Sequence, residues 1–130
     1  MKAGSFHVAV GRVRLDLPGV GSLKEKRKVI RPLVQRLRDR FGVSASEVGH
    51  QDVWQSSVIA VAAVGGDRSG LDGLVHDAMR FVQRSADAVV VDFSVELVSI
   101  GEIHSETEPE GGLDADTASI EEKWLVGEEE

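Results

Sequence analysis

The chain has 130 residues, a net charge of −7 and no cysteine, which excludes a disulfide framework, a thiol nucleophile and a zinc site with sulfur ligands. Its first residues lack the apolar run of a signal peptide, and no apolar stretch reaches the roughly 20 residues of a membrane span. We therefore expect a soluble cytoplasmic protein that makes no contact with a membrane.

The charge is divided unevenly along the chain. Residues 1–101 hold 14 basic and 11 acidic side chains, whereas residues 102–130 hold 11 acidic side chains against Lys123 alone. The length suits one domain of about 100 residues with an appendage. We predict a domain at residues 5–101 and a disordered acidic tail at residues 102–130. Within the tail, residues 119–125 suit either a short docking helix or more disordered chain.

The first half of the domain predicts a strand followed by a helix. Residues 6–17 alternate between apolar and polar side chains, as a half-buried strand does. After a loop with Pro18, Ser22 and Glu25 form a capping box that opens a helix, and Gly42 ends this helix. Pro32 removes a backbone donor inside the helix, so we expect a kink or a split there.

The second half predicts two strands, a helix and a last strand. Residues 43–48 and 53–64 are strand-like, with a hairpin at residues 49–52 between them. Asp67 caps a second helix that runs to about Arg84, and residues 89–97 alternate as a final strand. The order βαββαβ predicts an α+β, ferredoxin-like two-layer sandwich, with a four-stranded antiparallel sheet and two helices on one face.

The third predicted strand is apolar on both of its faces, although a sheet covered by helices on one side should keep one wet face. This pattern favours a homodimer through the sheet or an apolar patch that the surface tolerates. The central strands carry no row of exposed aromatic residues, so the sheet lacks the stacking platform with which some RNA-binding modules hold bases.

The first predicted helix concentrates positive charge, with eight Lys/Arg against Glu25 and Asp39. Three of the eight, Lys26, Arg36 and Arg40, occupy one flank of the helix. The other five form a stripe along the opposite flank, and these five are the candidate nucleic-acid-binding residues. Such a stripe suits a phosphate backbone, and cations near a helix N-terminus oppose the helix dipole unless an anion binds there. A solvated surface or an acidic protein partner also fits the pattern. The candidate residues are Lys24, Arg27, Lys28, Arg31 and Arg38.

A second candidate group surrounds the predicted hairpin, where Glu47, His50 and Asp52 precede Trp54. Two carboxylates and an imidazole suit acid–base chemistry and, less specifically, a metal. The structural alternative is a hairpin cap, in which His50 and Asp52 bond turn amides and Trp54 anchors the loop on the core. We assign no catalytic residue, metal or cofactor from the sequence.

Several segments together resemble the YlxP-like family, a bacterial domain-of-unknown-function family. They are the Pro18-Gly19 turn, the run Ser-Leu-Lys-Glu-Lys-Arg at 22–27, the run Glu-Val-Gly-His-Gln-Asp at 47–52, and Trp54-Gln55. The resemblance covers roughly residues 6–100 and implies a ferredoxin-like fold. It also implies an RNA-linked role, because genes of this family often lie among those for translation and ribosome maturation. It supplies no catalytic residues, and the long acidic tail departs from the common family form.

The sequence thus favours a non-catalytic accessory factor that binds RNA or the ribosome through its first helix. One alternative is a protein-interaction module whose basic helix meets an acidic partner. Another is a small enzyme that uses Glu47, His50 and Asp52.

Overall fold

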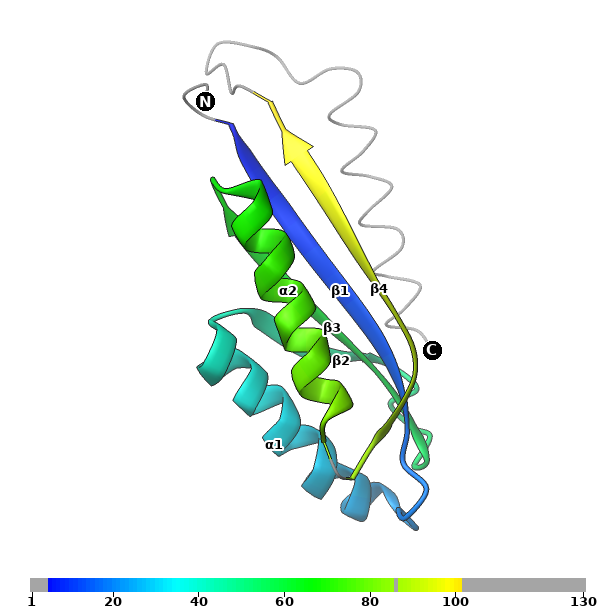
Figure 1. The fold of residues 1–130 in the computed structure, drawn as a ribbon. Helices are drawn as coiled ribbons and strands as arrows, with labels where there is room; N and C mark the ends of the chain where they lie inside the picture. Colours follow the sequence, from blue (N-terminus) through cyan, green and yellow to red (C-terminus); the bar gives the residue numbers. More distant parts are fainter. Residues whose placement is uncertain (1–4, 86, 102–130) are drawn as a thin grey trace.

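Strands and helices follow one another in the predicted order in a computed structural model, which describes residues 5–85 and 87–101 (Figure 1). Both helices lie on the same face of the sheet (Figure 1). The predicted tail, including residues 119–125, lies outside the described residues. In chain order the elements are β1 (Phe6–Asp16), α1 (Leu23–Phe41), β2 (Ser44–Gly49), β3 (Ser56–Gly65), α2 (Arg68–Gln83) and β4 (Val89–Ile100).

The sheet has the strand order β2-β3-β1-β4, and each neighbouring pair is antiparallel. β1 is central and pairs along its whole length, from His7 opposite Gly65 on β3 and from Phe6 opposite Ile100 on β4. The register of β2 against β3 shifts between Glu47 and Gly49, where the hairpin begins. This arrangement confirms the predicted ferredoxin-like βαββαβ sandwich.

The alternation in β1 decides which side of the sheet the helices cover. Its inward residues are buried and include Ala9, Gly11, Val13 and Leu15, whereas Arg12 and Arg14 point to the open face. Gly11 is required by packing, because a Cβ there would lie 2.9 Å from Val75 Cγ1 of α2. Glycine at position 11 therefore lets α2 approach β1 more closely than a residue with a Cβ would allow.

The core lies between the helices and this inward face. α1 contributes Ile30, Leu33, Val34 and Leu37, and α2 contributes a second apolar stripe. Burying each such side chain stabilises the fold by roughly 1.5–3 kcal/mol relative to leaving it exposed. Met79 is part of the α2 stripe and is 1% exposed. The α2 stripe consists of Leu71, Val75, Ala78, Met79 and Val82.

The ends of α1 follow the predicted capping chemistry, except that the Glu25 side chain bonds the amide of the residue before the N-cap. Ser22 Oγ accepts a hydrogen bond from the Glu25 amide at 3.1 Å, and Glu25 Oε1 accepts one from the Gly21 amide at 2.6 Å. Gly42 ends the helix with a φ of 65°, the left-handed conformation that glycine adopts at little cost. The start and end of this helix are therefore fixed by the residues that the sequence singled out.

Of the two outcomes expected at Pro32, the split is wrong, because α1 continues as one helix from Leu23 to Phe41, whereas the kink stays a prediction. Pro32 is exposed, and buried residues on both sides of it hold the helix against the sheet. Core packing thus offsets the one backbone hydrogen bond that the proline removes.

Two strand boundaries and one helix cap also differ from the sequence expectations. β3 begins at Ser56 rather than residue 53, and β4 extends to Ile100. Asp67 occupies the N-cap of α2, but its side chain makes no capping hydrogen bond. The late start of β3 leaves residues 50–55 as a loop beside the N-terminal half of α1, and this loop forms one wall of the candidate site.

The open face of the sheet is apolar along β3, as the two-sided pattern predicted. Val58, Ala60, Ala62 and Val64 pair with open-face residues of β1, and Val64 is 69% exposed. The homodimer through this face stays a prediction. Among the described residues, no helix is both long enough and apolar enough to span a membrane.

Candidate functional site

A buried lysine joins α1 to the loop between β2 and β3. Lys26 is 3% exposed, and its Nζ donates to the carbonyl oxygens of His50 and Val53 at 2.6 and 2.7 Å. The same Nζ lies 2.8 Å from Glu47 Oε2. These three partners use all three donors of an ammonium group, as burial of a lysine requires.

Glu47 is fixed in this cluster by a second contact. Its Oε2 also accepts a hydrogen bond at 2.6 Å from the hydroxyl of Ser57, a fully buried residue on β3. The carboxylate is thus occupied by one cation and one hydroxyl inside the fold. This position suits a structural role better than proton transfer to a substrate.

His50 shapes the loop that receives Lys26. Its φ is 56°, which is uncommon for any residue other than glycine, and its carbonyl also accepts from the Val53 amide at 3.0 Å. Its Nδ1 lies 2.7 Å from the Ser56 hydroxyl. The left-handed backbone and these bonds belong to a tight turn whose carbonyl oxygens face the ammonium group of Lys26.

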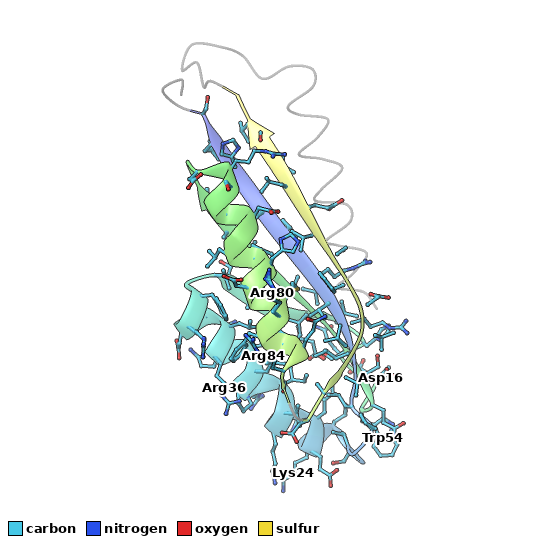
Figure 2. All side chains as sticks on the ribbon, viewed as in Figure 1. Asp16, Lys24, Arg36, Trp54, Arg80 and Arg84 are labelled. Atoms are coloured by element: carbon cyan, nitrogen blue, oxygen red, sulfur yellow. The ribbon has the colours of Figure 1, made fainter. Side chains whose placement is uncertain are left out.

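The other two hairpin candidates are exposed. Asp52 makes no hydrogen bond or ion pair to any residue between 5 and 101 that the structure describes. Trp54 is 47% exposed and lies at the tip of the loop (Figure 2). The expectation that Trp54 anchors the loop on the core is therefore wrong, because Lys26 provides this anchor. Among the described residues, no group of three His, Cys, Asp or Glu is arranged to hold a metal.

Three of the cations on α1 are held by the fold, and we call them the anchored cations: Lys26, Arg38 and Arg40. Arg38 donates from Nε and Nη2 to the Ala45 carbonyl of β2 at 3.0 and 2.8 Å. The Arg40 guanidinium lies 5.2 Å from the centre of the Phe81 ring on α2. Arg38, a candidate nucleic-acid-binding residue, thus also ties the helix to an edge strand.

The remaining candidates form what we call the free cations: Lys24, Arg27, Lys28 and Arg31. All four are exposed, and none makes a salt bridge or side-chain hydrogen bond within the described part of the chain. Lys24 projects from the first turn of α1 (Figure 2). The pairs Lys24/Lys28 and Arg27/Arg31 are four residues apart, so like charges stand on neighbouring turns.

A shallow cleft of about 240 Å³ brings the two candidate groups together. We call it the α1–hairpin cleft. One wall carries Arg27 and Arg31 from α1, and the other carries Asp52 from the loop. The sequence treated these residues as two unconnected groups. The full lining is Leu23, Lys26, Arg27, Ile30 and Arg31 from α1, with Glu47, Gln51 and Asp52 from the hairpin.

Lys26 is the residue that sequence reasoning misplaced, since it was grouped with Arg36 and Arg40 on one flank of the helix, whereas the structure buries it. A signal was present, because Lys26 lies four residues before Ile30 and so shares the buried stripe of the helix. A lysine on an apolar stripe indicates a buried partner, and the carboxylate of Glu47 supplies it.

Comparison with known proteins identifies the family without identifying an activity. Residues 8–95, which reach from β1 into β4, match the family model described as "Protein of unknown function (DUF503)". The chain is also 39% identical over 62 residues to the uncharacterized protein YlxP of Bacillus subtilis (strain 168), covering 48% of this chain and 67% of that protein. The predicted resemblance is thereby confirmed: the chain belongs to the DUF503 family and is homologous to YlxP.

Proposed function

We propose that this protein is a non-catalytic accessory factor that binds structured RNA, free or within the ribosome, through the free cations of α1. The single observation that carries the proposal is the absence of anionic partners for these four side chains among the described residues. Cations that face a phosphate backbone are expected to lack partners of their own.

The position of the free cations strengthens this argument. Lys24 lies in the first turn of the helix, where the dipole is positive and a cation costs about 0.3–1 kcal/mol, and Arg27 and Lys28 follow in the second turn. The like-charged pairs on successive turns add a smaller cost. A bound phosphate relieves both terms, which gives the arrangement a use that a merely solvated surface lacks.

The mode of binding would be recognition of the backbone by a helix. Val10 and Arg12 of β1 and Ala60 of β3 lie on the open face of the sheet, where the two central strands carry no row of aromatic residues for stacking. Contacts to phosphates set affinity and orientation but carry little sequence information. We therefore expect broad binding to RNA with a steep dependence on salt.

The test is a salt titration of binding to a short stem-loop RNA. Arg27→Ala with Arg31→Ala should weaken binding and flatten the salt slope by ~1–2 units. The matched control is Arg36→Ala with Arg68→Ala, which removes two exposed arginines that do not line the cleft.

An unchanged salt titration for the Arg27/Arg31 variant contradicts the proposal. Copurification from cell extract with and without nuclease separates RNA from an acidic protein partner. A partner that survives nuclease and is lost in the Arg27/Arg31 variant would show that the helix binds protein instead.

A further inference from the structure

The α1–hairpin cleft contains carboxylates as well as cations, which a simple basic surface would not require. Its polar groups fall into two sets that differ in what they already bind. Lys26 and Glu47 form an ion pair at 2.8 Å, so each already has an opposite charge beside it. Arg27, Arg31 and Asp52 line the same cleft and have no ion pair within the described ranges 5–85 and 87–101.

The free carboxylate of Asp52 argues against a simple phosphate site. A carboxylate beside two guanidinium groups repels a second anion and lowers the affinity of the cleft for phosphate alone. The ligand that fits therefore carries an anion at one end and hydrogen-bond donors at the other, because an ionised carboxylate can only accept.

The apolar part of the lining suits a flat ring. Its two apolar lining residues are Leu23, which is 39% exposed, and Ile30, which is 4% exposed. A volume of about 240 Å³ is below the roughly 300–1,000 Å³ of pockets that hold a complete small-molecule ligand. The cleft is thus matched to part of a longer ligand, such as one nucleotide of a chain, rather than to a whole cofactor.

We propose that the α1–hairpin cleft holds one unstacked guanine nucleotide of a bound RNA. Arg27 and Arg31 hold its phosphate, Leu23 packs against the base, and Asp52 accepts from the base edge. Among the four RNA bases, guanine alone presents two adjacent donors, N1–H and N2–H2, on its Watson–Crick edge, and a carboxylate can accept both. This inference rests on the proposed function and adds a base preference to it.

Gln51 completes the cleft. Its Nε2 donates to the Glu47 carbonyl at 3.3 Å, which orients the side chain along the loop and leaves its Oε1 as a further acceptor. A second acceptor beside Asp52 disfavours bases that present acceptors at this edge, so the loop contributes to rejecting the wrong base.

The experiment compares a short oligouridylate with the same oligomer carrying one central guanine or one central adenine, each at several salt concentrations. The wild-type chain should bind the guanine oligomer about 5–10-fold more tightly than the others, within the range of one good bidentate base contact. Asp52→Asn should remove the preference for guanine without changing the salt slope. Arg27→Ala with Arg31→Ala should flatten the salt slope and leave the preference for guanine in place. The matched control Asp92→Asn removes an exposed carboxylate from β4 and should change neither.

The outcomes separate this inference from the proposed function. Equal binding of the three oligomers, with the Arg27/Arg31 dependence intact, overturns the guanine site and leaves RNA binding standing. A uniform gain for all oligomers in Asp52→Asn also overturns it, since Asp52 would then act only by repulsion. If the wild-type chain binds neither the oligomers nor the stem-loop RNA, both proposals fail.

Discussion

Two sets of cations on α1 differ in whether their side chains contact other elements of the fold. The anchored cations each contact a carbonyl, a carboxylate or an aromatic ring of another element. The free cations contact no other charged group of the described chain, although one of them, Arg27, directly follows the anchored Lys26. The difference is set by the neighbours that the fold provides, because the side chains are chemically alike.

The comparison also shows why net charge is a poor guide to a binding surface. α1 carries eight Lys/Arg, yet three of them serve the attachment of the helix to β2, the hairpin and α2. An anchored cation contributes mainly to stability, and a free cation contributes mainly to the field that a partner meets. The following predictions separate these two contributions.

The largest effect is expected for Lys26→Met. The change leaves the Glu47 carboxylate and two carbonyl oxygens without their donor, and breaking such a pair costs about 3 kcal/mol of unfolding free energy. The lower end of the usual range applies because the Glu47 side chain is 22% exposed. Urea unfolding should show a lower midpoint with an unchanged slope.

Lys28→Met is the matched control, since it makes the same chemical change at an exposed position and should alter stability by at most about 0.5 kcal/mol. Adding Glu47→Gln to Lys26→Met should recover part of the loss, because the uncompensated charge is then removed. Equal midpoints for the Lys26 and Lys28 variants would show that the buried cluster contributes nothing.

A smaller loss is expected for Arg38→Ala. The variant removes two hydrogen bonds to the Ala45 carbonyl, and because the side chain is largely exposed we expect a cost of about 1 kcal/mol. RNA affinity should fall less than in Arg31→Ala, because Arg38 does not line the cleft. A larger affinity loss for Arg38 than for Arg31, in two variants that are both folded, would return Arg38 to the binding surface.

The fold was predictable because its signals are local and repeated. The alternation of β1 and the apolar stripes of the two helices each recur several times, so a misread residue changes little. Ser22 and Gly42 marked the ends of α1 by chemistry that acts within a few residues. Pro32 misled because its local penalty is offset by core packing that a sequence window does not contain.

The candidate site was predictable only in its parts. The free cations were all named from the sequence, but the cleft depends on a contact between Lys26 and backbone carbonyls of a distant loop. Those carbonyls converge because His50 takes a positive φ, and this backbone conformation could not be predicted from the residue type. Trp54 was expected inside because it is large and apolar, whereas the loop is held by a lysine and leaves the ring exposed.

The smallest effect, and the one that best separates stability from binding, is expected for Lys24→Glu. Residue 24 lies in the first turn of α1, where a negative charge is favoured by the dipole and where glutamate would also face Lys28 one turn later. We expect the variant to be about 0.5 kcal/mol more stable than the parent, although it binds RNA more weakly. Thermal unfolding and RNA titration on the same samples measure both quantities, and the gain in stability should fade at high salt, since exposed charges are screened. A variant that is both less stable and weaker in binding would place Lys24 among the anchored cations, and one that is more stable with undiminished binding would remove it from the RNA-binding surface.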